Sequence, residues 1–257
     1  MTWKAIARSA IGTRHAASGV PCQDCGNVLI FDDIVIGAVS DGAGSARYAE
    51  IGSDVAVNTV LKQLAKSLQW LRVQKCFGTS ALKVPFSHKR ARKIFSIALE
   101  ATLKSLRKKA QHLGCPLDEL ACTLIAFLAT PDWFAAVQIG DGFIAFRIPG
   151  EEYKLLFQPD KGEFANTTTF VVSTHFRMQI GIVTGSPQFI CAATDGLERA
   201  AIRFADWTPS QGFFSPLETY LRHEYKSPET CKVASLLSNK LNSKTDDDKT
   251  LVLCVLE

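Results

Sequence analysis

The sequence predicts an α+β fold in which two packed β-sheets are flanked by α-helices. Apolar, β-branched runs of strand length recur along the chain, and two long stretches repeat their apolar residues with the period of a helix. Their order is strands, two helices, many strands, one helical stretch and a final strand, which differs from the regular alternation of βαβ units. No internal repeat, low-complexity run or linker interrupts this order, so we expect residues 1–257 to form one domain.

The first strands precede the helices. Residues 3–10 predict an edge strand, and residues 12–25 read as a loop because of their Gly, Pro and Ser content. Residues 34–40 are apolar and β-branched, as in a buried strand. This strand ends abruptly at Asp41-Gly42, a turn signal, and the rest of the chain is organised around it.

Two helices follow that turn. The first has apolar residues at helical spacing from about residue 51 to 68, and residues 71–88 read as irregular. The second runs from about residue 89 to 112 and carries eight Lys and Arg side chains. We interpret its charge as a solvated helix face, because no aromatic residues alternate with the basic ones as they do in nucleic-acid-binding surfaces.

The second half of the chain returns to strands. Three are predicted in succession, at residues 121–129, 133–139 and 143–148, with a hairpin-type connection between the first two. Residues 150–187 are more polar and rich in turn residues. The remaining elements are a strand, a helical region and a final strand, at residues 189–194, 217–241 and 251–256.

Composition restricts the class of protein. Of 257 residues, 47% are hydrophobic, which is enough to bury one large core or two modest ones. The formal net charge of +4 is mild and does not indicate dedicated nucleic-acid binding. No apolar run approaches membrane-spanning length, and no signal peptide is present. The eight cysteines lie mostly within apolar runs, so we expect a soluble, cytoplasmic protein with reduced thiols.

Acidic residues stand at the tips of four strands that are predicted to be buried, at Asp41, Asp141, Asp195 and Asp246–Asp248. A lone Asp-Gly pair is usually only a turn, but here an acidic residue at the tip of an apolar strand recurs four times along the chain. Carboxylates that a fold brings together repel unless a positive charge lies between them, and Mg²⁺ and Mn²⁺ prefer oxygen ligands. We therefore expect a carboxylate-rich metal centre, whose ions would polarise a phosphate ester for hydrolysis.

Basic side chains beside the acidic loops would orient a bound phosphate. Arg14, His15 and Arg47 are the candidates by proximity in the sequence, and the alternative for each is an ordinary surface residue. Motifs of other enzyme classes, such as G-x-S-x-G, Walker-type G-K-S/T and H-E-x-x-H, are missing.

Taken in order, these motifs resemble the metal-dependent protein phosphatase family (protein phosphatase 2C type), especially its compact bacterial branch. The matching stretches extend from near residue 10 to the C-terminus: Gly12-Thr-Arg-His15, Pro21-Cys-Gln-Asp24, Ser40-Asp-Gly-Ala-Gly-Ser45, Ala121-Cys-Thr-Leu124, Gln138-Ile-Gly-Asp-Gly142, Gly162-Glu-Phe-Ala-Asn-Thr167, Thr194-Asp-Gly-Leu197 and Thr245-Asp-Asp-Asp-Lys-Thr250. The resemblance implies four layers, with a central β-sandwich of two mostly antiparallel sheets between helices. It also implies that residues 150–187 form a flap beside the active site.

The resemblance implies roles for five residues. Asp41 is similar to the aspartate that bridges two metal ions, and the backbone carbonyl of Gly42 to a further ligand. Asp195 and Asp247 are similar to the other aspartates of the first metal, and Asp24 to the aspartate that contacts metal-bound water. A hydroxide between two Mg²⁺ or Mn²⁺ ions would then attack phosphorus directly, without a covalent phosphoenzyme.

This sequence departs from the family pattern at three positions. Gln23 replaces a glutamate that usually binds the second metal, so we expect weaker binding there. Ala43 replaces a histidine that is considered a general acid in many members. Asp141 resembles a ligand of a third metal, but Arg199 occupies the position of its partner, so we expect two ions.

We therefore expect a serine/threonine protein phosphatase that acts on substrates of a serine/threonine kinase. It would work as a monomer without nucleic-acid or membrane partners. The family's phosphate-binding arginine lies closer to the acidic pair than Arg14 does, so either Arg14 or His15 fills that role. The alternative, motivated by Gln23 and Ala43, is a catalytically weak phosphoprotein-binding or regulatory module on the same fold.

Overall fold

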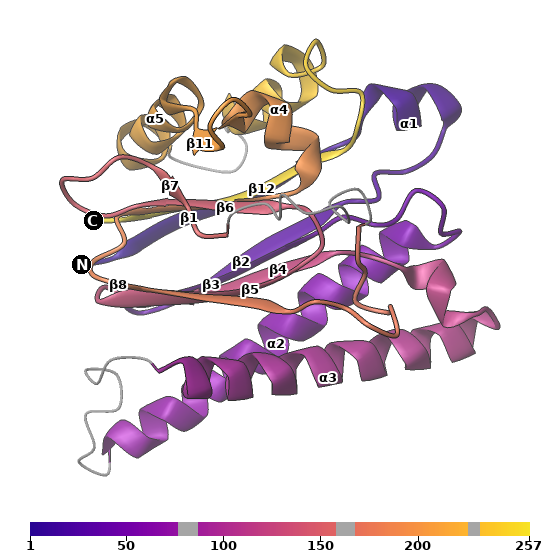
Figure 1. The fold of residues 1–257 in the computed structure, drawn as a ribbon, viewed down its shortest axis with the longest axis horizontal. Helices are drawn as coiled ribbons and strands as arrows, with labels where there is room; N and C mark the ends of the chain where they lie inside the picture. Colours follow the sequence, from indigo (N-terminus) through magenta and orange to yellow (C-terminus); the bar gives the residue numbers. More distant parts are fainter. Residues whose placement is uncertain (77–86, 158–167, 226–231) are drawn as a thin grey trace.

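Two five-stranded sheets lie face to face, with helices on both outer sides (Figure 1). The computed structural model describes residues 1–76, 87–157, 168–225 and 232–257. Every strand pair in the two sheets is antiparallel, which confirms the predicted α+β sandwich. Within the described residues, no helix is long and apolar enough to cross a membrane.

The strand orders place both ends of the chain in one sheet. The first sheet consists, in spatial order, of β1 (Trp3–Ala10), β12 (Lys249–Leu256), β9 (Phe189–Ala193), β6 (Phe143–Arg147) and β7 (Lys154–Leu155). The second consists of β2 (Cys25–Phe31), β3 (Ile34–Ser40), β4 (Leu124–Ala129), β5 (Trp133–Ile139) and β8 (Gln179–Thr184). The predicted edge strand at residues 3–10 is thus confirmed as β1.

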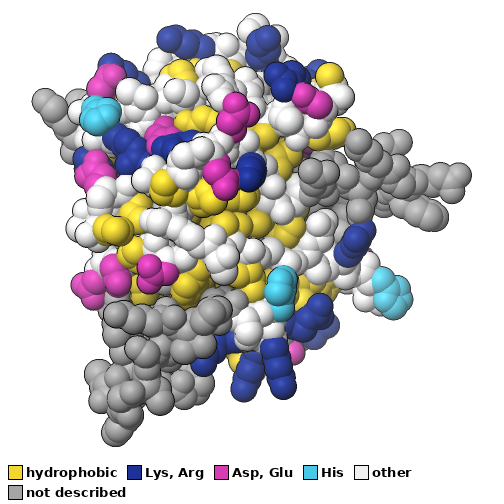
Figure 2. Space-filling view, turned by 60° about the vertical axis from the view of Figure 1, so that its left-hand side comes forward, with side chains coloured by type: hydrophobic (Ala, Val, Ile, Leu, Met, Phe, Trp, Pro, Cys, Tyr) yellow, Lys and Arg dark blue, Asp and Glu magenta, His cyan; other side chains and the backbone are white. Residues whose placement is uncertain are grey.

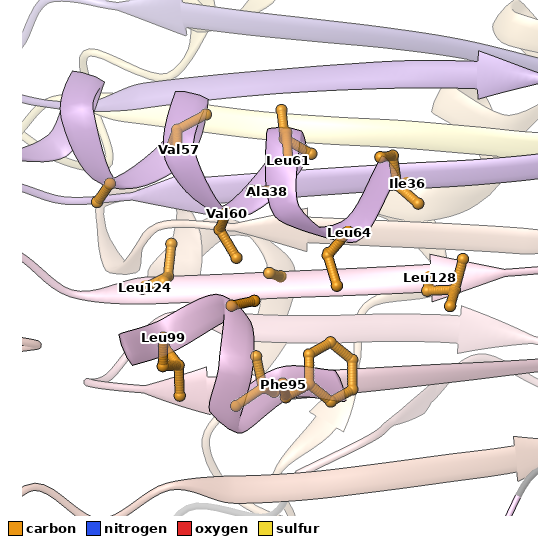
Figure 3. Close-up of a cluster of buried hydrophobic side chains, with 14 of the residues drawn as sticks. Ile36, Ala38, Val57, Val60, Leu61, Leu64, Phe95, Leu99, Leu124 and Leu128 are labelled. Carbon is orange, nitrogen blue, oxygen red and sulfur yellow. The ribbon is translucent and has the colours of Figure 1, made fainter. Parts of the chain in front are cut away.

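Two long helices cover the outer face of the second sheet. They are α2 (Ala49–Cys76) and α3 (His88–Leu113), and their apolar stripes pack against β3 and β4 (Figure 3). Leu64 of α2 and Phe95 of α3 are both fully buried in this layer. The sequence predicted an irregular segment from residue 71, but α2 continues to Cys76; residues 77–86 lie outside the described part.

Shorter helices cover the first sheet. They are α4 (Glu198–Ala201), α5 (Gln211–Thr219), the π-helical turn η3 (Tyr220–Glu224), α6 (Lys232–Ser235) and the π-helical turn η5 (Leu236–Lys240). The predicted helical region at residues 217–241 therefore begins earlier, at Gln211, and consists of several short pieces. A two-stranded ribbon, β10 (Ile202–Arg203) with β11 (Thr208–Pro209), lies between α4 and α5.

The two sheets make contact through apolar side chains and one glycine. Phe127 and Phe134 of the second sheet meet Val252 and Ile190 of the first in one buried cluster. At Gly37 of β3, an added Cβ would lie 2.4 Å from the Phe127 ring and 3.0 Å from Val252. A side chain at this position would separate the sheets.

The chain passes between the sheets at residues 140–142. The prediction of a third strand after this turn is confirmed, but β6 belongs to the first sheet, whereas β4 and β5 belong to the second. Gly140 has a φ of 100°, and a Cβ there would also lie 2.5 Å from Thr123. Both restrictions require glycine at the crossing point.

Two other predicted segments differ from the structure. The stretch at residues 12–25, read as a loop, contains the short helix α1 (Thr13–Ser18), which ends at Gly19 in the left-handed conformation. Part of the segment at residues 150–187 is regular sheet, because β7 and β8 lie at its two ends. Residues 158–167, which include one of the quoted motifs, lie outside the described part.

Candidate active site

Strand register brings the acidic tips together at one end of the sandwich. Cys25 of β2 pairs with Ser40 of β3, so Asp24 and Asp41 follow as neighbours just beyond the ladder. Asp41 is held from the other side by Thr123, whose hydroxyl accepts from the Asp41 N–H at 2.9 Å and whose own N–H donates to the Asp41 carbonyl at 2.8 Å. The end of the second sheet therefore presents two adjacent carboxyl groups.

The first sheet contributes its acidic residues at the same end. Ala193 of β9 pairs with Phe143 of β6 and with Leu251 of β12. Asp195 therefore lies beside Asp141, which precedes β6, and beside the acidic run that precedes β12. The turn after β9 is the single 3₁₀ turn η2 (Asp195–Leu197). A Cβ on Gly196 would lie 1.9 Å from the Asp248 carbonyl, so only glycine permits this approach.

One hydroxyl joins the two sheets within the acidic cluster. The Thr194 side chain donates to Asp24 Oδ2 at 2.7 Å, across the space between the sheets. Burial and the charge of Asp248 raise the pKa of Asp24 to about 7. Burial and the charges of Asp24 and Asp195 raise the pKa of Asp41 to about 11. In the absence of a cation, the crowding of these buried carboxyl groups therefore favours the neutral form of Asp41.

The other side of the cluster is also electrostatically crowded. Burial and the charges of Asp141 and Asp247 raise the pKa of Asp195 to about 6. Burial and the charge of Asp195 raise the pKa of Glu198 to about 7. Lys249 is fully buried nearby, but its ammonium group donates to the Asp247 backbone carbonyl at 3.1 Å and to Asn242 Oδ1 at 3.3 Å rather than to one of these carboxylates. A polyvalent cation would relieve this repulsion.

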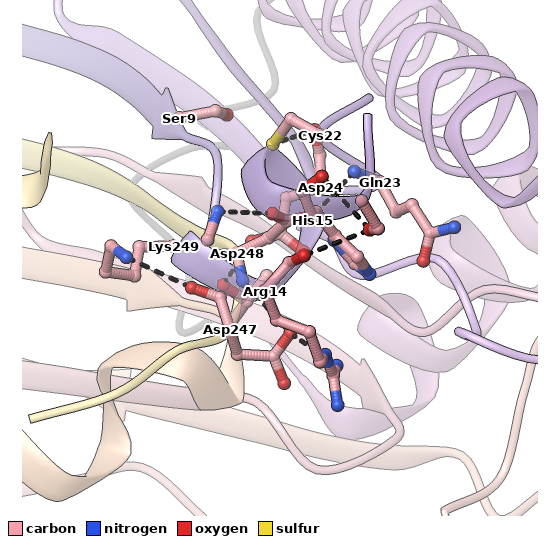
Figure 4. Close-up of polar contacts among 12 residues, drawn as sticks. Ser9, Arg14, His15, Cys22, Gln23, Asp24, Asp247, Asp248 and Lys249 are labelled. Atoms are coloured by element: carbon pink, nitrogen blue, oxygen red, sulfur yellow. Dashed lines mark hydrogen bonds and ion pairs between the residues drawn. The ribbon is translucent and has the colours of Figure 1, made fainter. Parts of the chain in front are cut away.

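Asp247 and Asp248 are adjacent but have different surroundings (Figure 4). The Asp247 side chain is 41% exposed, and its Oδ1 accepts from the guanidinium of Arg14 at 3.3 Å. Asp248 is buried: its carboxylate accepts from the N–H groups of Gly12 and Gln23, both at 2.6 Å. Its Oδ2 also lies 2.9 Å from His15 Nδ1. Asp247 thus faces the acidic cluster and solvent, whereas Asp248 fixes the loop that carries Arg14, His15 and Gln23.

Two buried oxygens in the cluster have no hydrogen-bond partner, namely Gln23 Oε1 and Asp24 Oδ1. Buried acceptors of this kind are rare in folded proteins, and an unseen ion is one of the usual reasons. The donor set is all oxygen, as Mg²⁺ and Mn²⁺ prefer. In the described part of the chain, no three Asp, Glu, His or Cys side chains lie close enough together to hold a metal ion as they stand. The chemistry of the donor set, all oxygen and rich in carboxylates, suits divalent cations.

The remaining predicted positions separate into those near the cluster and those away from it. Gly42 is buried, and a Cβ there would lie 2.6 Å from the Ala49 carbonyl. Ala43 is also buried, in a small cluster with Ala46, Ala49 and Ala121. Arg47 is exposed and stacks on Tyr48, with 5.2 Å between its Cζ and the ring centroid.

A family model described as protein phosphatase 2C matches residues 11–240. The chain belongs to the protein phosphatase 2C family.

Its relatives and structural neighbours agree with this membership. The chain is 29% identical to serine/threonine-protein phosphatase 3 of Escherichia coli (strain K12), over 99% of both chains. Its fold is similar to that of the serine/threonine phosphatase Stp1 from Staphylococcus aureus, with a TM-score of 0.64, 12% identity and coverage of 100% and 96% of the two chains. It is also similar to RsbX in complex with magnesium, with a TM-score of 0.57, 14% identity and the same coverage.

Sequence reasoning missed several residues of this protein phosphatase 2C site. Thr194 and Thr123 position Asp24 and Asp41; both lie within motifs that carry the family resemblance, but no role was predicted for either of them. Asp248 lies within the predicted acidic run, but the run does not show which aspartate faces inward. The alternation of β12 gives a partial signal, because neighbouring side chains must point to opposite faces.

Proposed function

We propose that the chain is a serine/threonine protein phosphatase that depends on two divalent cations, Mg²⁺ or Mn²⁺. The observation that carries this proposal is the convergence of Asp24, Asp41 and Asp195 at one end of the sandwich, together with a buried Asp24 oxygen that has no hydrogen-bond partner. Carboxyl groups that lie this close together repel one another, and bound cations would remove that repulsion. The magnesium recorded for RsbX supports the same choice of metal.

The acidic residues divide into ligands and supports. Asp41, Asp195, Asp247 and the Gly42 carbonyl would hold the cations, and Asp24 would accept a hydrogen bond from water bound there. When bound, the cations supply positive charge to the phosphate and lower the pKa of water. The burial of Asp24 and the partly buried position of Asp195 keep the local dielectric low, which strengthens every charge interaction with the ester.

Arg14 is the residue that we assign to the phosphate. Its side chain is 58% exposed and makes a single 3.3 Å contact with Asp247, so its remaining N–H groups are available to an anion at the mouth of the site. His15 differs, because its side chain is only 11% exposed and its Nδ1 is held by Asp248. We therefore propose that Arg14 binds phosphate oxygens and that His15 positions the loop.

The substrates would be phosphoserine and phosphothreonine in proteins modified by a serine/threonine kinase. We further propose that the protein works as a monomer in a reducing compartment such as the cytoplasm. Six cysteines, Cys22, Cys25, Cys115, Cys122, Cys191 and Cys254, are free thiols, which supports the compartment.

A second candidate function is a catalytically weak phosphoprotein-binding module. Two observations favour it: the neutral Gln23 at the expected second-metal position, and the alanine cluster around Ala43 where many members have histidine. Such a module would bind phosphopeptide tightly with little turnover.

Phosphate release from a phosphothreonine peptide across Mn²⁺ and Mg²⁺ titrations distinguishes the two functions. We expect saturable, cation-dependent turnover that is lost in Asp195→Asn, with binding of the peptide retained. Tight peptide binding with equal, negligible release from both proteins would favour the binding module.

A further inference from the structure

One strongly charged surface lies outside the acidic site. Helix α3 carries eight Lys and Arg residues and one Glu, whereas the whole chain has a net charge of +4, so the rest of the chain is net negative. Six of these basic side chains are exposed, and we call them the α3 basic face: Lys89, Arg92, Lys93, Lys104, Arg107 and Lys108. In Figure 2, Lys and Arg side chains gather at the bottom of the molecule, where Figure 1 places α2 and α3.

The α3 basic face is only partly compensated within its own helix, where Glu100 is the one acidic residue and lies four residues before Lys104. Among the described residues, no salt bridge joins any of the six side chains to an acidic group. Lys89 and Lys93, like Lys104 and Lys108, are four residues apart, and like charges at this spacing destabilise a helix. The first turn has no acidic residue, so Lys89 also opposes the helix dipole. These charges are costly within the chain, which points to a partner outside it.

The C-terminal half of the α3 basic face lies at the same end of the sandwich as the acidic cluster (Figure 1). The helix ends at Gly114, and the 3₁₀ turn η1 (Leu117–Leu120) leads directly into the site. There, the Ala43 N–H donates to the Ala121 carbonyl at 2.9 Å, close to the Thr123 bonds that hold Asp41. With 26 residues, α3 extends about 39 Å from this end. A chain that leaves the site can therefore follow the helix.

We propose that the α3 basic face docks an acidic segment of the phosphoprotein substrate while the phosphorylated residue occupies the acidic site. This inference rests on the proposed phosphatase function and adds a substrate class to it, namely phosphoproteins with an acidic segment beside the phosphorylated residue. Charge complementarity selects a polyanion. The chemistry of α3 favours a peptide over a nucleic acid, because its one Phe, Tyr or Trp ring, Phe95, is buried and its exposed apolar residue, Ile97, suits a side-chain contact.

Two phosphothreonine peptides test the proposal. They share the same phosphorylated segment, and a flexible linker of about 10 residues joins it to a run of Glu in one peptide and a run of Gln in the other. At low salt with saturating Mn²⁺, we expect kcat/KM to be roughly three- to tenfold higher for the Glu peptide, mainly through KM. The difference should shrink as salt shortens the Debye length.

Variants locate the effect on α3. The double variant Lys104→Gln/Lys108→Gln removes two exposed charges and introduces Gln, a good helix former, at both positions. It should abolish most of the preference for the Glu peptide over the Gln peptide. Lys66→Gln/Lys240→Gln removes the same charge from exposed positions on α2 and η5 and should keep the preference. Hydrolysis of an aryl phosphate should be equal in all three proteins, which shows that the site itself is intact.

Direct binding separates failure of docking from failure of the phosphatase function. The fluorescence anisotropy of a labelled, unphosphorylated Glu peptide needs no turnover, and we expect Lys104→Gln/Lys108→Gln to weaken this binding about fivefold or more. Equal KM values for both peptides, or equal losses in both double variants, would overturn the proposal while leaving the phosphatase function in place. Tighter binding of a single-stranded RNA than of the Glu peptide would also overturn it. No release from either peptide or from the aryl phosphate would instead remove the phosphatase function.

Discussion

The imidazole Nδ1 of His15 lies 2.9 Å from Oδ2 of Asp248, a carboxylate that also accepts two backbone N–H groups. This contact connects the N-terminal loop to the start of the last strand, 233 residues later. It holds Gln23 and Asp24 at the position where β2 begins. The buried Asp248 is therefore the residue on which the geometry of the acidic cluster depends most.

Replacing Asp248 with Asn should lower the free energy of unfolding. The amide places an NH₂ group where a carboxylate oxygen now accepts, so the N–H of Gly12 or Gln23 is left buried without a partner, at a cost of about 1–3 kcal/mol. Urea unfolding monitored by tryptophan fluorescence measures this loss. Asp246→Asn is the matched control, because that side chain is exposed; a similar midpoint in both variants would contradict the assignment.

Replacing Gly196 with Ala should be severe, because its Cβ would meet the Asp248 carbonyl at 1.9 Å. We expect backbone displacement to lower the free energy of unfolding by about 3 kcal/mol or more, and the melting temperature therefore to fall by many degrees. Gly44→Ala has free space, with Gln23 Oε1 at 4.0 Å as the nearest atom, and should leave the melting temperature nearly unchanged. Equal melting temperatures in the two variants would show that the close approach is unimportant.

Without divalent cations, the free energy of unfolding should decrease as the pH rises. The folded pKa values of Asp24 and Asp41, about 7 and about 11, lie above the ordinary value of 3.8, so the folded state binds more protons. Their contribution is complete below about pH 4 and is lost as the pH rises through about 7 for Asp24 and toward 11 for Asp41.

Urea midpoints in EDTA at about pH 5.5 and about pH 8 measure this trend. Excess Mn²⁺ should reverse it, because cations bind the ionised carboxylates and not the protonated ones. A midpoint in EDTA that does not change with pH would contradict the raised pKa values.

Replacing Gln23 with Glu should strengthen cation binding at the second position, on the order of tenfold, because the charge of the ligand set becomes more negative. The same change should destabilise the cation-free protein, since it adds a charge to a buried, crowded cluster. Calorimetric titration with Mn²⁺ measures the cation affinity, and thermal unfolding in EDTA measures the stability of the cation-free protein. Gln23→Met, which removes the buried oxygen, is the opposite control; if it binds Mn²⁺ as the wild type does, Gln23 is not a ligand.

Local sequence signals predicted most of the fold, and long-range packing explains the differences. The pattern at residues 34–40 identified β3, and the hairpin signal at residues 130–132 identified the β4–β5 pair. The sequence pattern of β6 could not predict that this strand joins the other sheet, because an apolar strand pattern indicates burial and does not indicate which sheet the strand belongs to. Helix α1 was missed because six residues are too few to establish a period.

The candidate site shows the same division. Asp41 and Asp195 could be predicted because each ends a buried strand, but these strands belong to different sheets, so only the packing of the two sheets brings the two residues together. The distinction between Asp247 and Asp248 required the structure, since it depends on which carboxylate the Gly12 and Gln23 N–H groups reach.

The central claim is that the cluster around Asp41 is a cation-dependent phosphatase centre, and Asp41→Asn tests it most directly. Asparagine resembles the protonated carboxyl, so the variant should be more stable than the wild type in EDTA at about pH 8, by about 1 kcal/mol or more. Phosphate release from a phosphothreonine peptide with saturating Mn²⁺ is the measurement. We predict that the folded variant loses at least about a hundredfold in kcat. Retention of wild-type turnover by this variant would contradict the account.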